Sequence, residues 1–339
     1  MNCHSQLVRF TEDDVRRFGP ASEAWESGAD APQMWGTRRV GPDLAREGGR
    51  KSRDWQLAHL WNPRHVVPDS VMPGYPWLFD GAQTRPRREA VDLVNYLESL
   101  GRDARLAGLS GPGPLSGRDP EEERRKGMFC DCAIPRTAGI APVWDTTLAV
   151  GERERFARKG AEVFARDCAG CHGRKGTGDG PAAVALTPAP RNLATALFSD
   201  RSLSEALWNG VPGSSMPSWN DLPSGELRGL VEYLKTIAST EPPPDLAAAE
   251  QATGKAIYVK QCAVCHGQTG AGDGPSAAIL DPAPTNFHEV RPTVDYAEAA
   301  LANGVRGTAM PKWGPKLTPN ERSLLARYVR AFYKKGTVE

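Results

Sequence analysis

Two matching segments, residues 168–219 and 262–313, constrain this chain more than any other feature. Each begins with Cys-x-x-Cys-His and reaches Met-Pro-x-Trp at the same distance, with 44 residues from histidine to methionine in both copies. The copies align at an offset of 94 residues without a gap, and the alignment also superposes Gly-Asp-Gly-Pro, Pro-Ala-Pro and an asparagine. Repeats of solenoid proteins are shorter, so these segments indicate two domains that each bury a core of their own.

Each element of the repeat has a chemical function in covalent haem binding. Two thiols add to the vinyl groups of the haem, the adjacent imidazole becomes the proximal iron ligand, and a distant thioether takes the other axial position. A redox dithiol or half of a zinc site also uses Cys-x-x-Cys, but neither requires Met-Pro-x-Trp at a fixed distance. We therefore expect two haem c groups. Their attachment and axial residues are Cys168, Cys171, His172 and Met216 in the first copy and Cys262, Cys265, His266 and Met310 in the second.

A histidine and a methionine together make haem iron six-coordinate and low-spin, and the soft thioether favours the ferrous state. Because both axial positions are filled, the sequence predicts one-electron transfer, with no catalytic residue in the chain. The second ring nitrogen of a ligand histidine usually donates to a backbone carbonyl. The candidates for that carbonyl are Pro188 or Pro190 in the first copy and Pro282 or Pro284 in the second, and the alternative is that these prolines only make the loops rigid.

The start of the chain, Met1-Asn2-Cys3-His4, has the form of the end of a third Cys-x-x-Cys-His motif. This interpretation places the first cysteine before Met1 and predicts that the natural chain continues upstream through a helix and an export or anchor segment. The alternative is an accidental Cys-His pair near a terminus. The printed sequence contains no secretory signal and no apolar run of about 18 residues, although haem attachment of this kind takes place outside the cytoplasm.

The following hundred residues favour a third haem domain. Segment 35–50 contains Gly-Pro-Asp-Leu, segment 59–64 reads His-Leu-Trp-Asn-Pro-Arg, and segment 67–77 contains Met-Pro-Gly-Tyr-Pro-Trp. Together with the Cys-His-Ser-Gln start, these segments resemble the mono-haem subunit of cbb3-type cytochrome c oxidases over about residues 2–100. The resemblance implies a cytochrome c fold. The site residues that it implies are Cys3 for haem attachment, His4 and Met72 as axial ligands, and Pro42, whose carbonyl accepts a hydrogen bond from the histidine.

The family carries a first cysteine and a preceding helix that the printed sequence lacks, so a third haem c is expected if the full-length chain supplies that cysteine. Residues 151–336 resemble the tandem class I cytochrome c domains of the di-haem subunit of the same oxidases. We therefore expect a mainly α-helical chain of three tandem cytochrome c domains, the first without its N-terminal helix. The expected domains are 1–105, 151–239 and 248–339, joined by a flexible linker at 106–150 and a proline-rich linker at 240–247.

Apolar residues at helical spacing predict an amphipathic helix before each complete motif, in which Gly160 and Gly254 allow a C-terminal helix to approach closely. C-terminal helices are predicted at 89–100, 227–238 and 321–333. The shorter linker suggests that the second and third domains stay close together, whereas the longer linker suggests that the first domain sits elsewhere.

Five further residues are candidates for a chemical role. Cys130 and Cys132 form Cys-x-Cys in the long linker. We interpret them as surplus thiols, because two ligands at this spacing make no closed metal shell, and a strained bridge in an oxidising compartment is the alternative. His59, His65 and His288 are candidate partners of haem propionates or alternative axial ligands, although most lone histidines are neither.

The resemblance implies an electron-transfer subunit, not an enzyme by itself, on the periplasmic side of the bacterial cytoplasmic membrane. Such a subunit carries electrons from a donor cytochrome or a quinol-oxidising complex to the haem–copper catalytic subunit of a cbb3-type oxidase. It belongs to a membrane complex, which it joins through an N-terminal anchor or a partner. A formal net charge of +1 predicts no nucleic-acid binding.

Two other function classes stay open at this point. One is an electron-transfer cytochrome of a periplasmic dehydrogenase or of another respiratory complex, because tandem domains of this kind recur there. The other is a di-haem peroxidase. A peroxidase needs one open or displaceable iron position, and three Met-Pro pairs argue against it.

Overall fold

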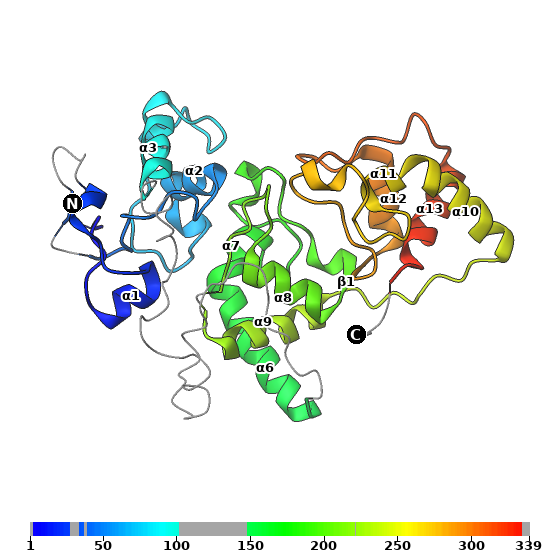
Figure 1. The fold of residues 1–339 in the computed structure, drawn as a ribbon, viewed down its shortest axis with the longest axis horizontal. Helices are drawn as coiled ribbons and strands as arrows, with labels where there is room; N and C mark the ends of the chain where they lie inside the picture. Colours follow the sequence, from blue (N-terminus) through cyan, green and yellow to red (C-terminus); the bar gives the residue numbers. More distant parts are fainter. Residues whose placement is uncertain (1–2, 28–33, 37–38, 102–147, 221, 334–339) are drawn as a thin grey trace.

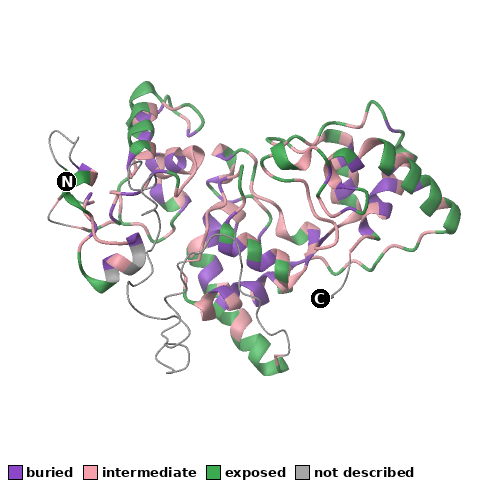
Figure 2. Cartoon of the chain, in the orientation of Figure 1, coloured by how far each residue is buried: buried purple, intermediate pink, exposed green. Residues whose placement is uncertain are grey.

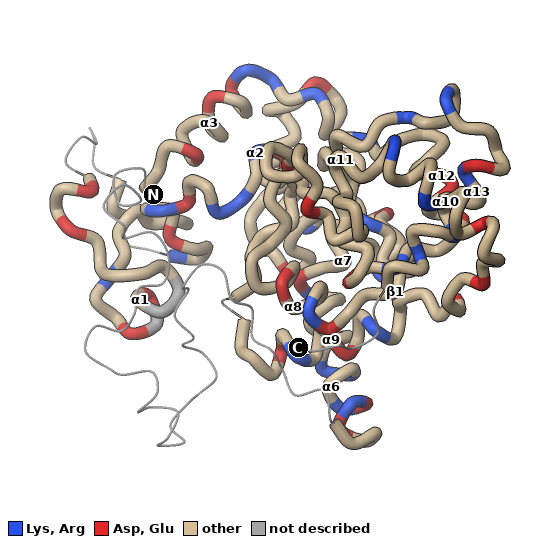
Figure 3. Tube along the Cα trace, turned by 45° about the vertical axis from the view of Figure 1, so that its right-hand side comes forward, with Lys and Arg blue, Asp and Glu red and all other residues tan. Residues whose placement is uncertain are grey.

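The computed structural model describes residues 3–27, 34–36, 39–101, 148–220 and 222–333, and it arranges three domains along its longest axis (Figure 1). In this part of the chain the fold is mainly α-helical, as predicted, with a single two-stranded sheet. Cys130, Cys132 and residues 106–147 of the expected linker lie outside the described residues. Basic and acidic residues are interspersed on all three domains (Figure 3). No helix in the described ranges has both the length and the apolar character needed to cross a membrane.

The first domain consists of short helices joined by long loops. Helix α2 begins after Ser52, whose hydroxyl accepts a hydrogen bond from the Trp55 amide and so caps the helix. Helix α3, predicted at 89–100, places the buried Ala90 and Val94 in a core cluster with Leu60 of α2. The elements are α1 (Glu12–Phe18), η1 (Ala24–Ser27), α2 (Arg53–Trp61), η2 (Pro63–His65), η3 (Pro76–Leu78) and α3 (Arg88–Ser99).

The second and third domains repeat one order of elements, and the predicted C-terminal helices of both are confirmed as α9 and α13. The second domain contains α6 (Val150–Val163), the π-helical turn η4 (Phe164–Cys168), α7 (Ala169–His172), η5 (Ala183–Ala185), η6 (Leu193–Thr195), β1 (Ala196–Phe198), α8 (Asp200–Asn209) and α9 (Ser224–Ile237). The third contains α10 (Ala248–Gln261), α11 (Ala263–His266), η7 (Ala277–Ile279), β2 (Val290–Pro292), α12 (Val294–Asn303) and α13 (Pro319–Arg330). Buried residues gather where α6, α8 and α9 meet (Figure 2).

The first helix of each complete domain crosses the last at a glycine, as the sequence predicts. A Cβ atom on Gly160 of α6 would overlap the carbonyl oxygen of Gly229 in α9. A Cβ atom on Gly254 of α10 would lie 2.9 Å from Cδ2 of Tyr328 in α13. The glycines therefore set the distance between the two helices that close each domain.

The second and third domains are related by a local two-fold arrangement. Strands β1 and β2 pair antiparallel, with Leu197 opposite Arg291, and these two residues occupy the same position in the repeat. Gly213 of the second domain lies against the Asp281 and Pro282 backbone of the third, and the equivalent Gly307 lies against Pro188. The expectation that these two domains stay close is confirmed.

The first domain also packs against the second, so the expectation that it sits elsewhere is wrong. Ser52 donates its hydroxyl proton to the Ser215 hydroxyl across 2.7 Å, and the Asp54 carboxylate accepts from the Thr187 amide across 3.0 Å. A Cβ atom on Gly170 would overlap the carbonyl oxygen of His65. The composition of the linker carried no information about these contacts, because they are made by the domains themselves.

Replacing Gly160 by alanine is expected to destabilise the second domain by about 1–3 kcal/mol, because the added methyl group must push α6 away from α9. Gly225→Ala is the matched control, since a Cβ atom at Gly225 of α9 meets nothing within 4 Å. Denaturant titration of the haem-loaded chain, followed by circular dichroism, measures both variants. Equal midpoints for the two variants would contradict the close crossing.

Candidate haem sites

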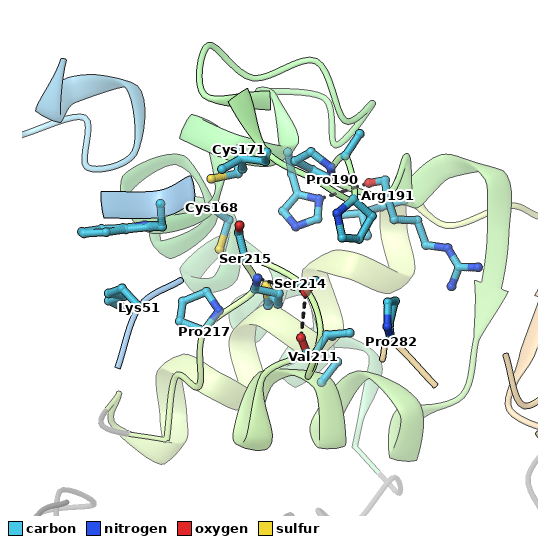
Figure 4. A pocket seen from close by; sticks show the side chains of 18 of the residues that line it. Lys51, Cys168, Cys171, Pro190, Arg191, Val211, Ser214, Ser215, Pro217 and Pro282 are labelled. Carbon is cyan, nitrogen blue, oxygen red and sulfur yellow. Dashed lines mark hydrogen bonds between the residues drawn. The ribbon is translucent and has the colours of Figure 1, made fainter. Parts of the chain in front are cut away.

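A cavity of about 1390 Å³ runs through the interior and is lined by residues of all three domains. Interiors of folded proteins are close-packed, so a space of this size marks a binding site. Figure 4 shows its part in the second domain, with Cys168 and Cys171 on one side and Pro190 and Arg191 on another. All three predicted ligand sets line this cavity: Cys3, His4 and Met72; Cys168, Cys171, His172 and Met216; and Cys262, Cys265, His266 and Met310.

Each predicted ligand histidine is oriented by one hydrogen bond from Nδ1 to a main-chain carbonyl. His4 lies 2.9 Å from the Pro42 oxygen, His172 lies 3.1 Å from the Arg191 oxygen, and His266 lies 3.2 Å from the Thr285 oxygen. When Nδ1 is the donor, the lone pair of Nε2 is free to bind a metal. The residues therefore fit a haem iron at each histidine.

The expected carbonyl is correct in the first domain and wrong in the other two. The carbonyl that accepts from the histidine belongs to the residue after Pro190 or Pro284, not to a proline. The Pro190 oxygen faces Gly178 instead, where a Cβ atom would lie only 2.5 Å away, and the Pro284 oxygen faces Gly272 in the same manner at 2.6 Å. The glycines of the Gly-Asp-Gly-Pro loops thus determine which carbonyl reaches the imidazole.

The three methionines share a support that the sequence reasoning missed. A hydroxyl two residues earlier accepts a hydrogen bond from the methionine amide. The Met72 amide donates to the Ser70 hydroxyl at 3.2 Å, and the Met216 amide donates to the Ser214 hydroxyl at 3.1 Å. Thr308 serves Met310 in the same way at 3.2 Å. Ser214 also donates to the carbonyl of Val211, three residues earlier, which closes the loop (Figure 4). Thr308 donates to the carbonyl of Val305 in the same way. The sequence did contain a signal for this support, because a serine or threonine stands two residues before the methionine in all three domains.

Burial favours the neutral form of three thiols and two imidazoles of this cavity, those of Cys168, Cys171, Cys262, His172 and His266. Desolvation raises the pKa of Cys171 to about 11 and that of Cys262 to about 11. It raises the pKa of Cys168 further. Desolvation lowers the pKa of His172 and His266, and the hydrogen bond to the carbonyl opposes that shift. Neutral imidazoles are the form that coordinates iron.

Of the three lone histidines, His59 lines the cavity, whereas His65 and His288 do not. The Nε2 atom of His59 lies 3.2 Å from the Met72 sulfur, and its ring stacks on Trp55 with centroids 4.7 Å apart. Burial, followed by the charges of His4 and Lys51, lowers its pKa to about 4, so the ring is neutral at physiological pH. His59 is therefore placed to contact the sulfur of Met72, the predicted axial ligand of the first domain.

His65 and His288 are engaged with other partners. The Nδ1 atom of His65 lies 3.2 Å from Oε1 of Gln83, and Nε2 of His288 lies 2.7 Å from the carbonyl oxygen of Thr269. His288 lines a separate hollow with Phe332. The structure therefore gives no support to these two histidines as axial ligands.

Removing the Ser214 hydroxyl deletes the hydrogen bond that holds the Met216 amide. The loss should destabilise the closed methionine loop by about 1 kcal/mol, which corresponds to about a fivefold change in the equilibrium between the closed and open loop. Exogenous imidazole should therefore displace the Met216 thioether about fivefold more readily from the ferric Ser214→Ala chain. Ser214→Thr is the matched control, because it keeps the hydroxyl, as Thr308 does in the third domain. An optical titration with imidazole measures this. Identical imidazole affinities for both variants and the unchanged chain would rule out the proposed support.

Family comparisons assign two kinds of cytochrome sequence to the chain. Residues 1–98 match the family described as cytochrome c oxidase, mono-heme subunit/FixO. Residues 155–234 and 249–329 each match the family described as cytochrome c oxidase, cbb3-type, subunit III. The three matches coincide with the three sets of ligands that line the cavity.

A curated relative and a solved structure are also similar to the chain. Cbb3-type cytochrome c oxidase subunit FixP of Azorhizobium caulinodans is 25% identical over 182 residues, which cover 50% of this chain. The match spans 58% of the length of that relative. A chain of a reducing HAO-like protein complex from Kuenenia stuttgartiensis is 27% identical, with a TM-score of 0.27, and the match covers 52% of this chain and 96% of that one.

Proposed function

We propose that this chain, a c-type cytochrome that joins a cbb3 mono-haem subunit domain to two cbb3 subunit III domains, carries electrons to the catalytic subunit of a cbb3-type cytochrome c oxidase. Electrons arrive at the third domain from a donor cytochrome or a quinol-oxidising complex, pass through the second domain, and leave from the first. The catalytic partner is a haem–copper subunit that reduces oxygen. The chain acts on the periplasmic side of the cytoplasmic membrane.

One observation carries the order of domains. The three ligand sets line a single cavity, and the second domain contacts both neighbours, through β1 on one side and through Ser215 and Thr187 on the other. A one-electron relay requires neighbouring sites, and the contacts of the second domain with both other domains support such an arrangement. The match of residues 1–98 to the mono-haem oxidase subunit supports the first domain as the one next to the catalytic subunit.

The residues of each site hold and protect the redox centre. When bound, haem c supplies an iron that exchanges one electron between its ferrous and ferric states. The paired cysteines anchor the group, and the histidine is held by its carbonyl. The methionine loop is held by its hydroxyl. Apolar side chains such as Leu203, Leu230 and Leu301 exclude water from the cavity, which keeps reorganisation during electron transfer small.

A third haem in the first domain is part of the proposal. His4 and Met72 line the cavity as the equivalent residues do in the other domains. Gly41 lies against the His4 ring so closely that a Cβ atom there would overlap it. Cys3 supplies a thiol on the same wall. These features give the first domain two axial residues and one attachment thiol, and the third haem c forms if the full-length chain supplies the first cysteine of the motif.

Membranes that contain a cbb3 haem–copper catalytic subunit but lack their own cytochrome subunits provide the test. Addition of the exported, haem-loaded chain should restore oxygen uptake driven by a reduced mono-haem class I cytochrome c. Met216→Leu should lower that uptake by about tenfold or more, because each ~59 mV of lowered potential shifts a one-electron equilibrium tenfold.

Met34→Leu is the matched control, since Met34 lies outside the three ligand sets and is 36% exposed. Restored uptake that is insensitive to Met216→Leu would remove the second domain from the route. A failure of the chain to restore any uptake would contradict the proposed function.

A further inference from the structure

The face of the second domain that covers its haem motif is occupied by the first domain of the same chain. Ala58 and Val66 of the first domain form one buried cluster with Ala182 and Leu186 of the second. Cys171, an attachment cysteine, packs at the edge of this cluster. One cytochrome domain thus docks directly beside the thioether side of another.

Small residues of the second domain make this contact close. Gly170, between the two cysteines, meets the His65 carbonyl, and no side chain fits there. Its own carbonyl accepts a hydrogen bond from the Ala182 amide at 3.0 Å, which joins α7 to the start of η5. Ala185, at the end of η5, is partly buried against the same cluster. The backbone therefore approaches the first domain without intervening side chains.

The equivalent face of the third domain has the same backbone but different side chains. Val264 stands at the position of Gly170, and its carbonyl accepts from the Ser276 amide at 3.0 Å. Ile279 stands at the position of Ala185. Val264 is 53% exposed and Ile279 is 85% exposed, so both apolar side chains are available for a contact with a partner.

The contacts between the second and third domains leave this face exposed. The third domain contacts the second through β2, Gly307 and the backbone of Asp281 and Pro282, which follow η7, while Val264 and Ile279 stay exposed. Of the described residues, the first domain packs on the second through residues 51–66, and no hydrogen bond joins it to α11 or η7. Val264 and Ile279 therefore form an apolar surface next to Cys265.

We propose that this surface, Val264 and Ile279 with the exposed side of η7, is the docking site for the c-type cytochrome that donates electrons to the chain. The inference rests on the proposed function and names the partner of its third domain. The occupant is a cytochrome domain because a cytochrome domain covers the equivalent face of the second domain. One electron leaves the ferrous iron of the donor and reduces a ferric iron of the chain, and no bond or proton is exchanged.

The larger side chains suit a partner that must leave again. A valine and an isoleucine hold the partner backbone farther away than a glycine and an alanine do, so the interface is smaller and less complementary than the intramolecular one. Small interfaces are typical of transient redox complexes. A permanent contact, as at Gly170, would prevent repeated turnover by a separate donor.

The experiment compares two electron sources for the full, haem-loaded chain. Stopped-flow mixing of the oxidised chain with a reduced mono-haem class I cytochrome c measures docking, and mixing with ascorbate and a small phenylenediamine mediator measures access without docking. Ile279→Glu should lower the second-order rate with the cytochrome by about tenfold, because a buried, unpaired charge opposes the apolar contact. Val264→Ser should lower the rate by a smaller factor. Both variants should keep their haem content and their rate with the mediator.

Val150→Glu is the matched control, because Val150 is a 76% exposed valine at the start of α6 in the second domain. Unchanged rates for both third-domain variants would overturn the docking site while the proposed function still stands. A light-scattering dimer that Ile279→Glu dissociates would assign the surface to a second copy of the chain and would also overturn it. A wild-type chain that accepts electrons from the mediator but restores no oxygen uptake would instead contradict the proposed function.

Discussion

The hydrogen bond from each predicted ligand histidine to a main-chain carbonyl is the interaction on which the sites depend. It fixes the ring of His172 relative to the one-turn helix α7, and it fixes His266 relative to α11. The accepting loop must therefore return to the haem motif from 19 residues further along the chain. Gly178 and Gly272 make that return possible, because the loop backbone lies against them. The methionine loop then closes the opposite side of the cavity.

The repeat in the sequence predicted most of the fold of the second and third domains and the two ligand sets there, whereas the family resemblance supplied the ligand set expected in the first domain. Cysteine spacing and histidine position are dictated by covalent chemistry, so they can be recognised without the structure. The crossing at Gly160 was also predictable, because glycine in the middle of an amphipathic helix is costly unless another backbone approaches it. The fold class followed from these features and from the family resemblance.

Other features could not be predicted because they depend on packing rather than on local chemistry. The choice of Arg191 over Pro190 as hydrogen-bond acceptor is decided by which carbonyl faces Gly178. The contact of the first domain with Gly170 is made by residues more than one hundred positions apart. The sequence showed a glycine there and a valine in the second copy, but it did not show what lay opposite them.

The same repeat unit is used in two ways. In the second domain, small residues beside the haem motif admit a neighbouring domain of the chain. In the third domain, Val264 and Ile279 leave the corresponding face open to solvent. The second and third domains contact each other through the same surface of each, as in a two-fold interface. Each domain then has its haem-motif face left for a different contact. A duplicated domain can thereby receive electrons at one end and deliver them at the other.

The most direct test of these sites is peptide mass mapping of the exported, mature chain after proteolysis. The peptides that contain Cys168–His172 and Cys262–His266 should each carry one haem through thioether bonds that survive extraction with acidified solvent. Unmodified cysteines in both peptides, with all haem lost to the solvent, would contradict covalent attachment and the electron-transfer role built on it.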